Sequence, residues 1–308
     1  EDMLYMSSQA TNSGNLSPES LAAINAVVAA NQRALDIVRQ AKEGTCCIDR
    51  IACPLATSHL VDLKMLGAVI KVAQLSELNY GRQKAAFELF KVALGFRSST
   101  NKVPLGVYRA VSVSIASSEL MGLEDALSRY PIPSEVLSEY ADFLANYEAQ
   151  TPPLSEVLNG EICFMLDQWQ NDFIWESNGV ILASLYFFSG CLMIDRLYSV
   201  RELRRIYKGY STEKSIEDQF AWRYGQSNDK NPWYTINASE RSMGLRLIDM
   251  HTADIARSRC ARVALAVEKF RIDNSRLPTD LNELNSSYQI HSILDPFTGK
   301  PLIYKRLS

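Results

Sequence analysis

The residues best suited to enzyme chemistry lie between positions 155 and 176, where acids and tryptophans share one stretch. Glu161, Asp167 and Asp172 occur there with Trp169 among them. Two carboxylates beside aromatic rings are typical of glycoside hydrolases, which need an acid and a base or nucleophile around one bond. The spacing also fits an amphipathic helix with its acids in solvent and its tryptophans inward. We favour the second interpretation.

A second group of candidate residues is aromatic and lies near a polar, turn-like segment at 228–232. Trp222, Trp233 and Tyr234 flank this segment and could form a recognition surface, because aromatic side chains are enriched where proteins bind partners. The same side chains could instead hold two structural units together. The sequence favours this internal packing role.

Three of the six cysteines, Cys46, Cys47 and Cys53, cluster in a turn-rich segment. A disulfide closing to Cys53 is a candidate in an oxidising compartment. With His59 the cluster could be considered a zinc site, but it lacks the paired Cys-x2-Cys spacing of such sites. We therefore expect no zinc here.

The other three cysteines, Cys163, Cys191 and Cys260, occur in apolar helical patterns, which predicts buried thiols. No phosphate-binding glycine loop, zinc-protease motif or nucleophile elbow occurs in the sequence. Its three histidines are far apart. The sequence thus predicts no cofactor and favours a protein that is not an enzyme.

The charge pattern argues against a nucleic-acid partner. The net charge is −3, and acidic and basic residues are spread along the sequence. The densest basic stretch, 201–208, predicts a solvated helix end. The most apolar stretch, 180–194, is shorter than the roughly 20 residues of a membrane span and predicts a buried helix. We expect membrane attachment only through a segment preceding Glu1.

Apolar residues recur at helical spacing through most of the sequence, and alternating strand patterns are hard to find before residue 290. Small alanines between large apolar residues in the second and third predicted helices resemble tetratricopeptide pairs. Caps, prolines and glycines give the boundaries. The predicted helices cover 18–42, 58–80, 82–97, 103–129, 134–149, 155–175, 178–208, 212–224 and 238–273.

The predicted fold is mainly α-helical, an irregular bundle or an array of antiparallel helix pairs with a small C-terminal α+β element. Composition suggests a loose lead-in at 1–16, a helical domain at 17–227 and the C-terminal element at 238–308. The long last helix has an expected apolar stripe that includes Ile248, Cys260 and Phe270.

The C-terminal element contains two turn motifs. The long helix ends in Asp-Asn-Ser-Arg-Leu-Pro at 273–278, and Asp-Pro-Phe-Thr-Gly follows at 295–299, leading to a predicted strand at 302–304. These motifs resemble the globular part of the major pseudopilins of type II secretion. Ser275 replaces the usual glycine and Leu277 the usual tyrosine. More than 230 residues precede the element, unlike in a pilin subunit.

The combination of a helical body and this tail is similar to a group of uncharacterised bacterial envelope proteins anchored by a preceding apolar helix. The resemblance implies a periplasmic or other extracytoplasmic location. Pseudopilins can hold calcium near this turn, which makes Asp295 the matching ligand candidate. Calcium needs about six to eight oxygens, so an aspartate that shapes its own turn is the favoured interpretation.

We therefore expect a non-enzymatic, envelope-associated scaffold or binding protein whose partner is a protein or an envelope component. Two alternatives stay open. One is a glycan-acting hydrolase that uses the carboxylates of the 155–176 helix. The other is a tetratricopeptide-like module that binds peptides on a concave face at 58–149.

Overall fold

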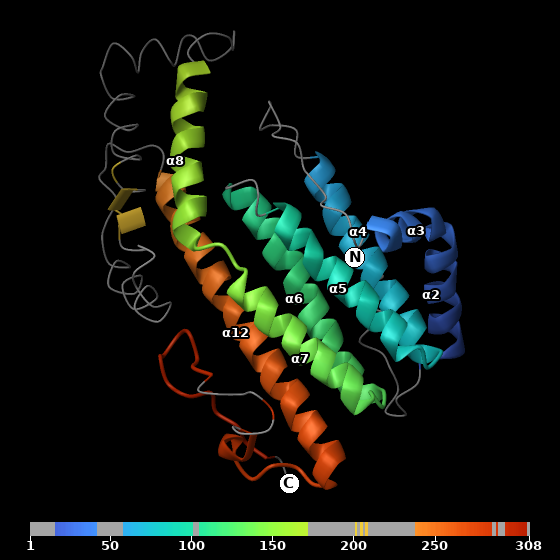
Figure 1. Ribbon diagram of the computed structural model, residues 1–308. Coiled ribbons are helices and arrows are strands. Elements are labelled where there is room, and N and C mark those ends of the chain that lie inside the picture. Colours follow the sequence, from blue (N-terminus) through green and yellow to red (C-terminus); the bar gives the residue numbers. More distant parts are fainter. Residues whose placement is uncertain are drawn as a thin grey trace.

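The computed structural model is mainly helical, as the sequence predicts (Figure 1). The structure describes residues 16–41, 58–100, 105–171, 201, 204–205, 207–208, 238–284, 288 and 293–306. Within these residues there are eight α-helices and one short 3-10 helix, and no strand. The elements are α2 (Pro18–Ala30), α3 (Gln32–Ala41), α4 (Ser58–Asn79), α5 (Gln83–Thr100), α6 (Gly106–Arg129), α7 (Ser134–Ala149), α8 (Leu154–Asn171), α12 (Ala238–Asn274) and η2 (Leu281–Leu284).

The first predicted helix is divided into two. It begins as expected, with Pro18 in the first turn and Ser17 Oγ accepting the Ser20 N–H at 3.2 Å. The prediction of one continuous helix over 18–42 is wrong, because α2 ends at Asn31 and α3 starts at the next residue. The Asn31 side chain donates to the Val27 carbonyl at 2.9 Å, and the Asn31 N–H is shared between the Val27 and Val28 carbonyls at 3.2 Å.

The pair α4 and α5 confirms the predicted helical hairpin. Gly81 lies between the two helices with φ +72°, a left-handed conformation that glycine adopts without strain. Its N–H donates to Leu78 O at 3.0 Å, and the Arg82 N–H donates to Glu77 O at 2.8 Å, which satisfies carbonyls at the end of α4. Since three residues connect helices that pack together, the two run in opposite directions.

The long helix α12 lies beside α6 and α7, and α8 contacts its N-terminal half (Figure 1). Its Leu265 is fully buried with Phe87 and Phe90 of α5 and Leu144 of α7. Helix α12, which the sequence analysis assigned to the C-terminal element, thus contributes to the same apolar core as α5 and α7. The division into domains at 228–237 stays a prediction, since those residues lie outside the described part.

The predicted helices at 178–208 and 212–224, and the apolar stretch at 180–194, fall almost entirely outside the described residues. The exceptions are helical and exposed, as expected of a solvated basic helix end, and comprise Arg201, Arg204, Arg205, Tyr207 and Lys208. Among the helices that the structure describes, none combines the length and apolar character needed to cross a membrane.

The end of α12 follows the predicted turn. Ser275 has φ +54°, so it ends the helix in the left-handed region. The strand predicted at 302–304 is wrong for this part of the protein. The backbone there makes only an isolated antiparallel bridge between Leu294 and Pro301, and Ile303 is 95% exposed. A strand needs a partner along its length, and no described segment supplies one.

Two cysteine predictions are also wrong. Cys163 and Cys260 are exposed rather than buried, while Cys191 lies outside the described residues. The periodicity of apolar residues placed Cys260 on the core side of α12. Ile248 and Phe270 of the predicted stripe are buried, but the buried face between them contains polar residues such as His251 and Asp254 and excludes Cys260.

Candidate functional site

Glu161 is the one predicted catalytic acid whose side chain the structure describes, and it is 6% exposed. Its carboxylate accepts a hydrogen bond from the backbone N–H of Gly106 at the start of α6. Leu105, the residue before α6, provides no capping side chain, so Glu161 from α8 takes that role across the helix interface. Burial raises the pKa of the Glu161 carboxyl, and the Gly106 bond lowers it in part.

The other predicted acids are not brought to Glu161 by any described contact. Asp167 lies in α8, but its side chain is outside the described part, and Asp172 is outside it entirely. The same holds for the aromatic candidates Trp222, Trp233 and Tyr234 and for the cysteines Cys46, Cys47 and Cys53. The glycan-hydrolase, aromatic-surface and disulfide hypotheses therefore stay predictions.

A buried polar cluster between α6 and α12 was not predicted. Arg109 of α6 is 2% exposed and its Nη2 lies 2.7 Å from His251 Nδ1 and 3.6 Å from Asp254 Oδ2 of α12. Because arginine only donates, His251 Nδ1 acts as acceptor and its ring proton lies on Nε2. We call these three residues the α6–α12 polar cluster.

The position of this cluster indicates a structural role. His251 is 5% exposed and Asp254 is 1% exposed, so a substrate in solvent would not reach either side chain without opening the interface. Breaking a buried charge pair by removing one partner is costly. The cluster therefore fixes how α6 and α12 lie against each other.

A second buried polar pair joins α4 to α6. Glu119 is fully buried, and its Oε2 accepts a hydrogen bond from Gln74 Nε2. Burial raises the pKa of Glu119 to about 8, and the Gln74 bond and the nearby Lys71 lower it only in part. Glu119 is therefore mostly protonated at neutral pH.

This raised pKa predicts a pH-dependent stability. The unfolded protein loses the Glu119 proton near its ordinary pKa of about 4.3, whereas the folded protein keeps it to about 8. The free energy of unfolding thus falls as pH rises between these values. Glu119→Gln, which mimics the protonated acid, is expected to gain unfolding free energy relative to the wild type as pH rises from 5 to 8, on the order of 1 kcal/mol for each pH unit.

Urea unfolding at several pH values measures this gain. Glu124→Gln, an exposed change on the same helix, is the matched control and is expected to leave the pH trend of the wild type unchanged. A constant difference between Glu119→Gln and the wild type across this pH range would contradict the assignment.

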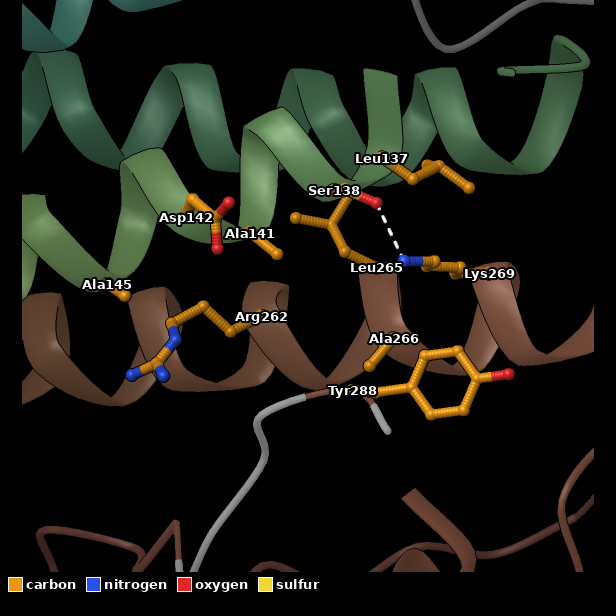
Figure 2. A pocket seen from close by; sticks show the side chains of 10 residues that line it. All are labelled: Leu137, Ser138, Ala141, Asp142, Ala145, Arg262, Leu265, Ala266, Lys269 and Tyr288. Atoms are coloured by element: carbon orange, nitrogen blue, oxygen red, sulfur yellow. Dashed lines mark hydrogen bonds between the residues drawn. The ribbon is translucent and has the colours of Figure 1, made fainter. Parts of the chain in front are cut away.

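The side chains of α7 and α12, together with Tyr288, line a partly open cavity of about 110 Å³, shown in Figure 2. Alanines at 141 and 145 on α7 and at 266 on α12 leave this space between the helices, because their side chains are too short to fill it. Leu137 and Leu265 close its inner side. The full lining comprises Leu137, Ser138, Ala141, Asp142, Ala145, Arg262, Leu265, Ala266, Lys269 and Tyr288.

Two cations and one exposed carboxylate give the α7–α12 cavity its polar character. Lys269 Nζ donates to Ser138 Oγ at 2.8 Å and lies 5.6 Å from the centre of the Tyr288 ring. Arg262 Nη1 contacts Glu148 at 3.3 Å. In the described part of the protein, no carboxylate lies within ion-pair distance of Lys269. Asp142 is exposed at the rim.

The C-terminal segment provides one wall of the cavity. The Tyr288 hydroxyl donates to Asp273 Oδ2 at 3.1 Å and accepts from Asn274 Nδ2 at 3.3 Å, which fixes the ring at the end of α12. Further along, Arg259 donates to Leu294 O at 2.6 Å and to Glu148 at 2.8 Å. These bonds hold the tail, α12 and α7 together on the side where the cavity lies.

The turn that follows Leu294 gives no sign of a metal site. Asp295 Oδ1 accepts the Phe297 N–H at 3.0 Å and Oδ2 accepts the Thr298 hydroxyl at 2.8 Å. Gly299 has φ +65°, which suits the turn. Both oxygens of Asp295 are thus occupied locally, and the described residues contain no group of three or more histidine, cysteine or acidic side chains that could hold a metal.

Comparisons of the sequence and structure with protein-family models, curated proteins and solved structures found no match. Function is therefore argued from the residues alone. The sequence carried a partial signal for the cavity, because Ala141 and Ala145 are four residues apart and share one face of α7. It carried none for the pairing of that face with Lys269, which depends on how α7 and α12 pack.

Proposed function

We propose that this protein is a non-enzymatic, envelope-associated binding or scaffold protein, and that its pseudopilin-like C-terminal element completes a binding cavity on the helical body. The observation that carries the proposal is the α7–α12 cavity itself. It is reached past an exposed residue, Asp142, and contains Lys269, a cation with no carboxylate partner among the described residues.

The buried ionisable groups support a binding role over a catalytic one. Glu161 binds the start of α6, Arg109 joins His251 and Asp254, and Glu119 pairs with Gln74. Each of these groups links two helices and is buried away from solvent. Catalytic acids and bases must reach a substrate, and these side chains bond to other helices instead.

The proposed envelope location rests only on the resemblance of the two turn motifs in the tail, whose local geometry is as follows. The left-handed Ser275 ends α12 where the pseudopilin pattern has glycine, and Asp295 organises the second turn through its own side chain. Both features belong to the two motifs on which the resemblance rests.

Photo-crosslinking tests the proposal. A photoreactive amino acid at Asn146, exposed one turn beyond Asp142 on α7, is expected to form adducts with a partner in the cells from which the protein comes. The same amino acid at Ala68, exposed on α4, which packs on α2, α5 and α6, serves as the control. Fractionation is expected to place both the protein and the Asn146 adduct in the envelope fraction.

Adducts of equal yield at both positions, or none at Asn146, would contradict a binding role for this face. Recovery of the protein in the cytoplasmic fraction would contradict the location. Release of reducing ends from a glycan, lost in a folded Glu161→Gln variant, would favour the hydrolase alternative.

A further inference from the structure

The α7–α12 cavity is small, which limits what it can hold. Its volume of about 110 Å³ is below the roughly 300 Å³ at which cofactor pockets begin. A cavity of this size holds several water molecules or a small organic group. A short chemical group of a larger partner fits this space better than a free cofactor does.

The electrostatics select an anion with a single charge. Lys269 has three N–H donors, one of which binds Ser138. Arg262 also has N–H groups other than the one that contacts Glu148. These donors can bond to a carboxylate oxygen within the cavity. The exposed carboxylate of Asp142 at the rim repels a second negative charge, which disfavours phosphate and dicarboxylates.

The remaining walls are apolar. Figure 2 shows Ala141 and Ala145 on the side of α7 that faces α12, with Ala266 of α12 beside the Tyr288 ring. Leu265 is fully buried behind them. Contact with these groups favours an aliphatic stem next to the charged group. The cavity therefore combines small apolar surfaces with an ammonium group.

We infer that the α7–α12 cavity binds a monocarboxylate carried on a short aliphatic stem. In a protein partner this chemistry occurs in an acidic side group and at the C-terminal residue of a polypeptide. The inference rests on the proposed binding role and adds the chemical class of the group that is recognised. Lys269 supplies the charge, Ser138 positions Lys269, and the alanines and Tyr288 accommodate the stem.

Propionate is the probe, and propionamide is its uncharged counterpart. Titration of the ¹⁵N-labelled full-length protein is followed by NMR, through the backbone amides of 138–145 and 262–269. Propionate is expected to produce saturable shifts there and propionamide none. Inorganic phosphate is expected to bind more weakly than propionate. Equal shifts with propionate and propionamide, or no saturable shift with propionate, would overturn the inference.

Charge variants locate the binding group. Lys269→Gln is expected to weaken propionate binding about tenfold, the loss of one charge-assisted hydrogen bond. Lys269→Arg is expected to stay within about threefold of the wild type, because the charge remains. Arg271→Gln, on the same helix but paired with Glu268 outside the cavity, is the matched control and is expected to change nothing. Unchanged binding in Lys269→Gln overturns the inference.

Asp142→Asn controls for loss of binding that is caused by misfolding. It is expected to strengthen propionate binding about threefold by removing a like charge from the rim, a gain that a misfolded variant cannot produce. Weaker binding in this variant would contradict the role given to Asp142.

Two peptides then distinguish an acidic side chain from a C-terminal carboxylate as the group that binds. One carries an internal glutamate and an amidated end, and the other carries no acid and a free C-terminus. Failure of both peptides and of propionate, with crosslinking at Asn146 intact, would remove the carboxylate inference and leave the binding role. Failure of the crosslinking as well would remove both.

Discussion

Arg109→Ala is expected to destabilise the protein by about 3–5 kcal/mol, the largest effect of any single change proposed. The substitution removes the guanidinium that contacts His251 and faces Asp254, and both remain deep in the interface between α6 and α12. Removal of the Arg109 charge beside a buried acidic side chain carries most of this cost. Chemical denaturation measures the loss.

The matched control for Arg109→Ala is Arg246→Ala, an exposed change on α12 that is expected to stay within about 0.5 kcal/mol of the wild type. Arg109→Met combined with Asp254→Leu is expected to recover much of the loss, because apolar side chains of similar size need no charge partner. A loss below about 1 kcal/mol in Arg109→Ala would show that the cluster does not hold the two helices together.

Gly106→Ala is expected to cost about 2 kcal/mol, although alanine normally favours a helix. A Cβ at this position would lie 2.6 Å from Leu247 Cδ1 and 2.8 Å from Glu161 Oε1. Both side chains are buried, which limits how far they can move aside. Displacement of Glu161 also weakens its bond to the Gly106 N–H and leaves a buried carboxylate poorly satisfied.

Gly95→Ala provides the contrast. No atom lies within 4 Å of a Cβ built at Gly95, which is exposed on α5, so the helix preference of alanine should dominate and stabilise the protein by up to about 1 kcal/mol. Thermal unfolding of the two variants side by side gives opposite signs if the close approach of α6, α8 and α12 is correct. Stabilisation in both would contradict it.

Local signals in the sequence were sufficient to place most helices. Ser17 with Pro18, Gly81, and the prolines on either side of α7 mark boundaries that depend on the backbone chemistry of single residues. The long α12 was predicted to within one residue at its C-terminal end. The break at Asn31 was missed, because asparagine is tolerated within helices and its competing side-chain bond depends on local geometry.

The polar interior and the cavity could not be predicted in the same way. Apolar periodicity assumes that a buried face is apolar, and this assumption fails for α12, whose buried face includes His251, Asp254 and Ser258. Arg109 and His251 are 142 positions apart, so nothing local links them. Lys269 and Ser138 are 131 positions apart, so no local signal links these two residues either. Only the packing of α12 against α6 and α7 brings these groups together.

Binding at the α7–α12 cavity is tested by combining the crosslinking experiment with the charge variants. The photoreactive amino acid is placed at Asn146 in the wild-type protein, in Lys269→Gln and in Arg271→Gln, and adduct yield is compared in the envelope fraction. If the partner binds at this cavity, the adduct is expected to be strongly reduced in Lys269→Gln and unchanged in Arg271→Gln, with both variants folded. An adduct of equal yield in all three proteins would contradict binding at the α7–α12 cavity.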